Sequence, residues 1–487
     1  MADVNKEPVA VKLPFETGEY LCTWNVPDGQ GGEREIPGML TVEPGRYPHG
    51  VLYGNMPIEW QAQGQGQRAA SFPQRHEFDV LTGRLSSGAY VALMNGELSY
   101  WFESQGRAIG ALAVLSLDEF DPSAHRAYSA IELQIEGLEA VAGVSPILRT
   151  TLPAPAAEEH TYSVTVDRDA SWDWNADGRR MTFRYDGSTR FADAYEFRMV
   201  FGPVLRIDSA QPLTIADWWM GWVRPLRQMM SVLTSGPREI RYFLASDGER
   251  SPRAHRDQVF GWDITHTPVN STRAAIEEIR SAVNLKEDEL SLLDLLIRWQ
   301  ELESAHHPLI ETYGSIATAD GQHPRSVFLL LLQALEGLYG YEHESQRADD
   351  LRKHKEKRDS FVERASECLA AADIRFLKKF LMKRPAQGLD QALIGLLSAL
   401  PYDVRPELEA THLVAQIRGE SREMRTIRVE SVIVKARNAL SHGASSFEPS
   451  TLDQMNRILD RVVRAETIRI LGGPASAQVR ALRGDAR

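Results

Sequence analysis

The sequence predicts an α+β protein, in which a β-rich amino-terminal domain is followed by an all-α carboxy-terminal region. Up to about residue 265, alternating or aromatic runs such as Tyr90-Val-Ala-Leu-Met and Ala130-Ile-Glu-Leu-Gln-Ile are divided by Gly, Pro and Asp, as strands are by turns. From about Ala274 onward, apolar residues recur at intervals of three and four, the period of helices. With 487 residues, of which 43% are hydrophobic, the chain is long enough for about two to four domains.

The β-rich part is assigned to residues 1–268 and is expected to form a twisted sheet or a sandwich. A further strand-like run begins at Tyr162, in Tyr162-Ser-Val-Thr-Val. One helix is predicted within this part, from Thr214 to Thr234, because threonine is a favoured N-cap residue. Five apolar residues at helical spacing are interpreted as packing against the sheet, not as a base-stacking platform: Trp218, Trp219, Trp222, Leu226 and Met229.

The all-α part is assigned to residues 269–475, and residues 476–487 are assigned to a C-terminal tail. Its apolar periodicity predicts helices that each bury one stripe against their neighbours. These are Lys286 to Glu303, Arg325 to Tyr341, Asp349 to Ala371, Leu389 to Leu400, Glu420 to His442 and Thr451 to Leu471. The most apolar run, Val327 to Leu332, is far too short to span a membrane.

The most informative segment is Arg437-Asn438-Ala439-Leu440-Ser441-His442-Gly443, at the end of one of these helices. Spacings of four, three and four residues put an apolar stripe on one helix face, at Val429, Ile433, Ala436 and Leu440. At about 100° per residue, Asn438, Ser441 and His442 share the opposite side with Arg437. Gly443 fits a helix C-terminal stop. One face is therefore expected to pack, while the other presents a cation, an amide and an imidazole.

These side-chain types suit the handling of a phosphate. An imidazole has an ordinary pKa of about 6.5, so near neutrality it can both take and give a proton. A guanidinium stays charged and offers a flat fork of donors to phosphate oxygens, and an amide can orient either neighbour. The alternative interpretation is structural: Arg437 is then a solvated surface residue, and His442 is a helix cap favoured by the helix dipole.

Five segments carry a resemblance to a known family. The Arg437–His442 string with its following Gly resembles the signature of HEPN-domain ribonucleases, and Val327–Tyr339 is similar to the first core helix of the ApeA-like HEPN group. Three amino-terminal segments resemble the domain that precedes HEPN in ApeA-type abortive-infection proteins: Gly18–Trp24, Ile36–Thr41 and Trp218–Leu226.

This resemblance implies a HEPN helical bundle, with its core at about residues 323–475, in an antiviral endoribonuclease of abortive infection. It further implies a homodimer with a catalytic groove between two bundles, and no metal or other cofactor. Carried over to this sequence, Arg437, His442 and Asn438 are the catalytic residues. Ser441, which shares their side of the helix, is a supporting candidate. The implied reaction is attack of a ribose 2′-hydroxyl on its own phosphate, which leaves 2′,3′-cyclic phosphate and 5′-hydroxyl ends.

The substrate implied by the resemblance is RNA, with transfer RNA as an attractive candidate that no residue demonstrates. The amino-terminal domain is expected to sense infection through a phage-derived trigger, or to hold the nuclease in check. The alternative function is a non-catalytic sensor or scaffold, in which the HEPN-like bundle only dimerises or binds nucleic acid.

Glu336 is a further candidate, in a helix that the apolar run beginning at Val327 marks as largely buried. A buried carboxylate requires a cationic partner. The functional interpretation is that Glu336 holds Arg437 in place. The structural interpretation, which the sequence favours, is an ion pair with another arginine such as Arg425 or Arg428.

The net charge of −12 is unevenly distributed, and this affects the partners to expect. Residues 1–170 hold 11 basic and 23 acidic residues, a balance of −12, so the other 317 residues sum to zero. Residues 351–385 hold 11 basic against 5 acidic residues, and residues 421–487 hold 12 against 7. Both flanks of the expected bundle can therefore attract a phosphate backbone, although a solvated helix face explains the first of them equally well.

The remaining features indicate a cytoplasmic protein without a metal site. The amino terminus shows neither signal peptide nor anchor, and the only two cysteines, Cys22 and Cys368, are too few for a disulfide framework. Asp173–Gly178 begins like a calcium-binding loop, but Arg184 stands where that loop needs a bidentate Glu, so a tight turn between strands is expected instead.

Overall fold

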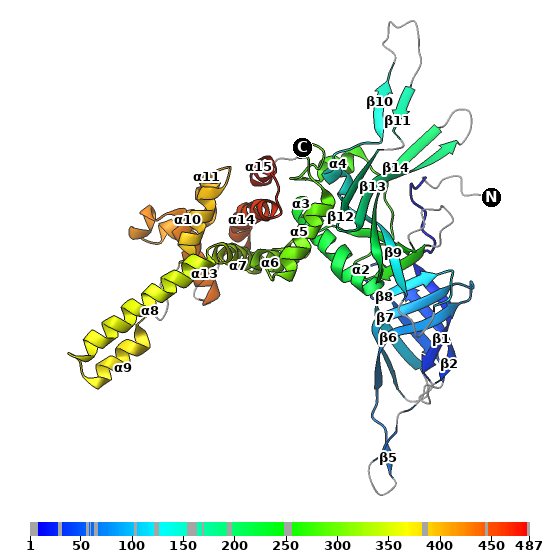
Figure 1. Cartoon of the computed structure of the whole chain (residues 1–487), viewed down its shortest axis with the longest axis horizontal. Coiled ribbons are helices and arrows are strands. Elements are labelled where there is room, and N and C mark those ends of the chain that lie inside the picture. The colour runs from blue at the N-terminus through cyan, green and yellow to red at the C-terminus, as the bar shows by residue number, and fades with distance from the viewer. Residues whose placement is uncertain are drawn as a thin grey trace. The chain divides into compact units, whose positions relative to one another are not determined.

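The chain forms two compact units in a computed structural model that describes residues 8–27, 32–54, 58, 60–62, 67–101, 105–120, 126–152, 163–167, 170–191, 197–247, 256–381, 388–443 and 447–484. The first unit comprises residues 1–230 and 238–297, and we call it the β-rich unit. The second comprises residues 231–237 and 298–487, and we call it the helical unit. Strands predominate up to residue 261 and helices alone follow in the described residues after it (Figure 1), which confirms the predicted fold class.

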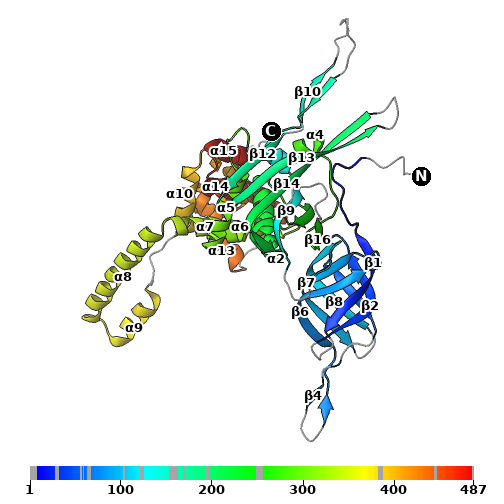
Figure 2. The same cartoon turned by 45° about the vertical axis from the view of Figure 1, so that its right-hand side comes forward.

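A closed barrel of six strands occupies the first part of the β-rich unit. Neighbouring strands pair in the order β8-β3-β2-β1-β6-β7, and β7 pairs again with β8 to close the ring (Figure 2). The expectation of a sheet or sandwich therefore missed the closure. The six strands are β1 (Gly18–Pro27), β2 (Glu33–Val42), β3 (His49–Tyr53), β6 (Gln74–Leu85), β7 (Tyr90–Trp101) and β8 (Gln105–Ser116).

Side chains fill the interior of this barrel. Trp24, Leu40 and Leu52 are fully buried in it, together with residues from β6, β7 and β8. The indole of Trp24 lies against the backbone of β3, where a Cβ at residue 50 would stand only 2.5 Å from its Cζ2. Gly50 therefore makes room for the largest side chain of the core, a common reason for glycine inside a strand.

The sheet continues beyond the barrel through β8. One edge of β8 pairs with β7, and the other is divided between β3 at residues 105–109 and β16 at residues 112–115. From β16 the order runs to β15, β9, β14, β13 and β12. These strands are β9 (Ala127–Ile135), β12 (Ser171–Ala176), β13 (Arg179–Phe191), β14 (Phe197–Thr214), β15 (Ile240–Ser246) and β16 (Asp257–Gly261).

Shorter elements complete the β-rich unit. The predicted turn at Asp173–Gly178 is confirmed, because Asp177 and Gly178 join β12 to β13 with φ values of 49° and 72°. Tyr162 lies outside the described residues, and the strand predicted there is β11, which begins at Ser163. The short elements are α1 (Leu138–Ala142), α4 (Arg273–Glu278), β4 (Gln61–Ala62), β5 (Arg68–Ala69), β10 (Ile147–Thr151) and β11 (Ser163–Val166).

The predicted tryptophan helix is confirmed as α2 (Ile215–Trp218), the π-helical turn η1 (Trp219–Val223) and α3 (Arg224–Leu233). Thr214 caps it as expected, with its hydroxyl accepting from the amide of Asp217 at 3.1 Å. Trp218 is fully buried and donates from Nε1 to the carbonyl of Tyr128 in β9 at 3.0 Å. The aromatic stripe therefore belongs to the core, as predicted.

The β-rich unit also buries an ion cluster around Glu132 on β9. Oε1 of Glu132 accepts from Nη1 of Arg206 and from Nη2 of Arg184, both at 3.2 Å, and Oε2 lies 3.0 Å from Nη1 of Arg256. The side chains of Glu132 and Arg206 are each only 6% exposed. Arg184 and Arg206 also pair with Asp186 and Asp208, at 3.0 and 2.6 Å, so three guanidinium groups and three carboxylates compensate one another around Glu132.

The helical unit is built around α7 (Pro324–Glu342), whose buried residues include Phe328, Leu331, Leu335 and Leu338. Its helices are α6 (Pro308–Ala317), α8 (Glu344–Ser366), α9 (Ala371–Phe380), α10 (Leu389–Ala399), α11 (Arg405–Glu409), α12 (His412–Gly419), α13 (Val429–Ser441), α14 (Pro449–Ile470) and α15 (Ala475–Arg483), with a 3₁₀ turn, η2 (Glu423–Thr426). The helix α5 (Leu292–Ser304) spans the boundary between the two units.

Several helical predictions need correction. The helix expected from Lys286 begins only at Leu292, and the helix expected to reach Ala371 ends at Ser366. The helix expected from Glu420 to His442 is interrupted, because residues 420–426 contain a single apolar side chain, Met424, and so have no stripe to bury; α13 starts only at Val429. Residues assigned to the C-terminal tail instead form most of α15, where Ala477, Ala481 and Leu482 are buried. None of the described helices is both long and apolar enough to cross a membrane.

Candidate active site

The predicted functional segment lies at the end of α13. Its apolar stripe is buried as expected, since Val429, Ile433, Ala436 and Leu440 are each at most 2% exposed. The helix ends at His442, whose amide donates to the carbonyl of Asn438 at 3.1 Å, and Gly443 follows in the left-handed conformation with φ 66°. This conformation favours glycine and turns the chain out of the helix.

The polar residues of this segment lie on the surface of the helical unit. Asn438, Ser441 and His442 are exposed, and the side chain of Arg437 is 38% exposed. The guanidinium of Arg437 is held between two oxygens: Nη1 donates to Oδ1 of Asn438 at 3.2 Å, and Nη2 donates to Oε2 of Glu336 at 3.5 Å. The structure thus orients Arg437 while leaving it open to a ligand.

Glu336 corrects one expectation. It lies on α7, but its side chain is 46% exposed rather than buried, on a part of the helix where Gln333 is exposed as well. Its partner is Arg437, not Arg425 or Arg428, so the functional interpretation describes the contact correctly. The buried carboxylate near this place is Glu430 of α13, whose Oε1 lies 2.9 Å from Nε of Arg405.

Sequence reasoning did not find Arg325, which lies near the start of α7. Its Nη2 donates to the carbonyl of Leu440, in the last turn of α13. Carbonyl groups at a helix C-terminus have no partner within the helix and attract cations. Arg325 therefore ties the end of the α13 helix to α7. Arg325 directly follows Pro324 at the start of α7, and nothing in that local sequence predicts a contact with α13.

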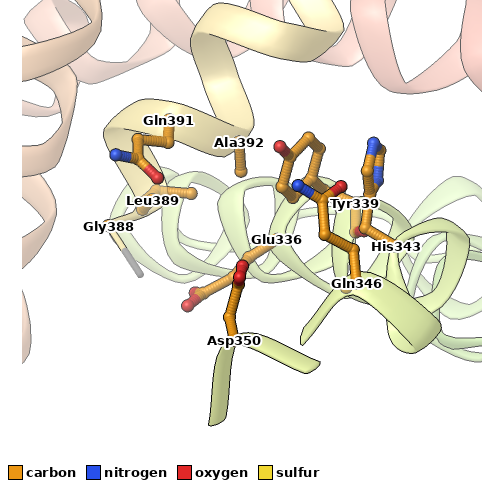
Figure 3. A pocket seen from close by; sticks show the side chains of 10 residues that line it. Glu336, Tyr339, His343, Gln346, Asp350, Gly388, Leu389, Gln391 and Ala392 are labelled. Carbon is orange, nitrogen blue, oxygen red and sulfur yellow. The ribbon is translucent and has the colours of Figure 1, made fainter. Parts of the chain in front are cut away.

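A pocket of about 100 Å³ adjoins Glu336, between α7, the start of α8 and the start of α10 (Figure 3). The polar and aromatic residues that line it are Glu336, Tyr339, His343, Gln346, Asp350 and Gln391. Glu336 therefore contacts Arg437 and also forms part of the pocket wall. No sequence motif marked this pocket, because its residues come from three helices.

The described residues contain no group of three or more His, Cys, Asp and Glu side chains placed to hold a metal ion. The groups that the site does offer are a guanidinium, an imidazole, an amide and a hydroxyl at the end of α13, and carboxylates on α7 and α8. This set can bind a phosphate and exchange a proton.

A comparison with known families identifies the class of protein. The model of ApeA N-terminal domain 1 matches residues 19–274, which is more than half of the chain. The chain therefore belongs to this family, and the resemblance found in the amino-terminal half of the sequence is confirmed. It is an ApeA-like anti-phage defence protein, whose helical carboxy-terminal half is compatible with a HEPN domain. No curated protein and no solved structure matches the chain.

Proposed function

We propose that the protein is a HEPN-type endoribonuclease that cleaves RNA during anti-phage defence, with Arg437, His442 and Asn438 as its catalytic residues. The observation that carries this proposal is the state of Arg437, oriented between Asn438 and Glu336 yet 38% exposed at the end of a helix whose other face is buried. A guanidinium fixed in this way is prepared to receive a phosphate.

The proposed reaction needs no nucleophile from the protein. The 2′-oxygen of a ribose forms a bond to the neighbouring phosphorus, and the bond from phosphorus to the 5′-oxygen breaks. His442 takes the proton of the 2′-hydroxyl and returns a proton to the leaving 5′-oxygen. Arg437 stabilises the negative charge that develops on the phosphoryl oxygens, and Asn438 keeps its guanidinium in position. The products carry 2′,3′-cyclic phosphate and 5′-hydroxyl ends.

The surface position of these residues supports a homodimer as the active form. Asn438, Ser441 and His442 are exposed on the helical unit, so a groove that excludes water requires a second surface. We propose that a second copy of the helical unit supplies it. The β-rich unit, which contains the family domain, would then recognise a phage-derived trigger.

The basic segment of α8 at residues 352–358 supports RNA as the substrate. Arg352, Lys353, Lys355 and Lys357 are all exposed there. Clustered cations of this kind bind the phosphate backbone without regard to sequence, and their contribution falls as salt rises. Within cellular RNA, transfer RNA is the substrate that we propose, and cleavage would take place in the cytoplasm.

The test is cleavage of total cellular RNA in EDTA by the purified wild-type chain, Arg437→Ala and His442→Ala. Two matched controls come from exposed residues outside the site, Arg425→Ala and His412→Ala. We expect cyclic-phosphate ends from the wild type and both controls, and their loss in the two site variants. An RNA with a 2′-deoxy nucleotide at the mapped cleavage position should resist cleavage.

Two outcomes would contradict the proposal. Cleavage that persists in both site variants would place the activity elsewhere or in a contaminant. Absence of cleavage by the wild type, even with lysate from infected cells, would favour the non-catalytic sensor or scaffold.

A further inference from the structure

The pocket beside Glu336 has a lining whose chemistry limits what it can hold. Glu336 and Asp350 contribute carboxylates, and Gln346 and Gln391 contribute amides. None of the described residues of the lining is a lysine or an arginine. A phosphate is disfavoured in this pocket, because the two carboxylates of the lining repel it. A neutral group that carries N–H donors is favoured instead.

One wall of the pocket is aromatic. Tyr339 and His343 stack on each other, with ring centroids 4.0 Å apart and an angle of 22° between the ring planes. The ring of Tyr339 also packs closely against α10, where a Cβ at residue 395 would stand 2.9 Å from its Cε2. Gly395 thus allows α10 to approach and complete the pocket. A flat aromatic surface of this kind can contact a nucleobase.

The position of the pocket connects it to the catalytic residues. Figure 3 shows the side chains of Glu336 and Asp350 together on one side of the pocket, below the first turn of α10. The same Glu336 carboxylate lies 3.5 Å from Nη2 of Arg437. Arg437, proposed to bind a phosphate, is therefore next to the pocket. This is the arrangement that the phosphate and the base of one nucleotide require.

We propose that this pocket receives a nucleobase adjacent to the cleaved bond and that it selects guanine. The inference rests on the proposed ribonuclease function. Guanine presents two N–H donors side by side on its Watson–Crick edge, N1–H and the 2-amino group, which one carboxylate can accept together. Adenine and cytosine present a single amino group beside an acceptor, and uracil presents one N–H between two acceptors. A bidentate pair discriminates between bases by about 1–3 kcal/mol, so a preference of at least about fivefold is expected.

The experiment uses the full-length chain carrying His442→Ala, so that binding is measured without cleavage. The probes are labelled single-stranded ten-nucleotide RNAs of adenosine and uridine with one central guanosine, inosine or adenosine. Inosine differs from guanosine only in lacking the 2-amino group. We expect the guanosine RNA to bind at least about fivefold more tightly than the inosine RNA.

Asp350→Asn supplies the decisive variant, because it keeps the size of the side chain but replaces an acceptor oxygen with a donor. We expect it to remove the preference for guanosine over inosine. Asp359→Asn is the matched control, since Asp359 lies on the same helix, outside the pocket lining, and is exposed. It should retain the preference.

The outcomes separate this inference from the proposed function when cleavage by the wild-type chain is assayed in parallel. Equal affinity for the three RNAs, from a chain that cleaves RNA, overturns the pocket assignment alone. Equal effects of Asp350→Asn and Asp359→Asn also overturn it. A chain that neither cleaves nor binds any of the RNAs overturns the proposed function as well.

Discussion

Two glutamates pair with arginines in this molecule, and their surroundings differ. Glu132 lies inside the β-rich unit, where three arginines surround it and its side chain is 6% exposed. Glu336 lies on the surface of the helical unit, where its side chain is 46% exposed and that of Arg437 is 38% exposed. A buried ion pair cannot lose one partner without leaving a charge in a medium of low polarity, whereas an exposed pair can exchange its partner for water or a ligand. The first arrangement therefore maintains structure, and the second is available for chemistry.

Glu132→Ala should have the largest effect. It removes the carboxylate that Arg184, Arg206 and Arg256 share, although Arg206, whose side chain is 6% exposed, keeps Asp208 as a partner at 2.6 Å. Removal of one partner from a buried pair costs about 3–5 kcal/mol of unfolding free energy. Urea unfolding measures this. The control is Glu43→Ala, which removes an exposed pair with Arg46 and should cost less than about 1 kcal/mol. Equal losses in the two variants would refute the structural assignment of Glu132.

Arg437→Lys should have the next largest effect, on cleavage rather than on stability. Lysine keeps the charge but loses the planar fork that Asn438 and Glu336 orient. Loss of one well-placed donor to a developing charge typically lowers the rate about 10²–10³-fold. Single-turnover cleavage should show this drop, and the unfolding free energy should change by less than about 1 kcal/mol. Arg425→Lys serves as the control. If Arg437→Lys cleaves at the wild-type rate, a positive charge at this position is sufficient and the planar guanidinium is not required.

Asp257→Asn should change how the unfolding free energy of the β-rich unit depends on pH. Burial raises the pKa of Asp257 above its ordinary value, although hydrogen bonds from Ser116 and Tyr128 and the charge of Arg126 oppose this. The folded state therefore holds its proton to higher pH than the unfolded state does. Stability from this group is full below the unfolded pKa of about 3.9 and is lost as pH rises through the folded pKa.

Urea unfolding of the wild type and Asp257→Asn, at several pH values above about 4, should reveal this difference. The free energy of the wild type relative to the variant should fall by about 1.4 kcal/mol for each unit by which the pKa is raised. Asn retains an acceptor for the Tyr128 hydroxyl, which lies 2.6 Å from Oδ2 in the wild type. A difference that does not change with pH would contradict the raised pKa.

Glu336→Gln should have the smallest effect on stability, below about 1 kcal/mol, because the pair with Arg437 is exposed. Gln keeps one oxygen that can accept from Arg437 but loses the charge. If Glu336 positions Arg437, the cleavage rate should fall by roughly tenfold or less, the modest effect of weakening one charge-assisted hydrogen bond. Gln333→Glu, at another exposed position on α7, controls for a general change in charge. A loss of several kcal/mol of unfolding free energy would instead mean that Glu336 has a structural role like that of Glu132.

The sequence predicted what depends on local periodicity. The buried stripe that ends at Leu440, the cap at Thr214 and the buried Trp218 follow from spacing along one element, and each is found. Features that depend on contacts between separate helices or strands were not predictable from the sequence. Closure of the barrel requires that β8 return to β7, and the pocket requires three helices to converge.

Glu336 shows the same limit within a single residue. Its apolar neighbours predicted a buried helix, yet only one side of α7 is buried, and a carboxylate on the other side is exposed. Which side of an apolar helix meets solvent is decided by how many neighbours pack on it. The sequence of the helix alone does not determine how many other elements pack against it.

The shared strand β8 has a consequence for how this protein can be divided. Because β8 closes the barrel through β7 and carries the open sheet through β16, a fragment that stops before residue 105 loses both. A fragment that begins after residue 116 leaves the β16 edge of the sheet unpaired. Such edges invite association with other chains. The family domain matched over residues 19–274 contains β8 together with both parts of the sheet that it joins, so we expect this domain to fold as one unit.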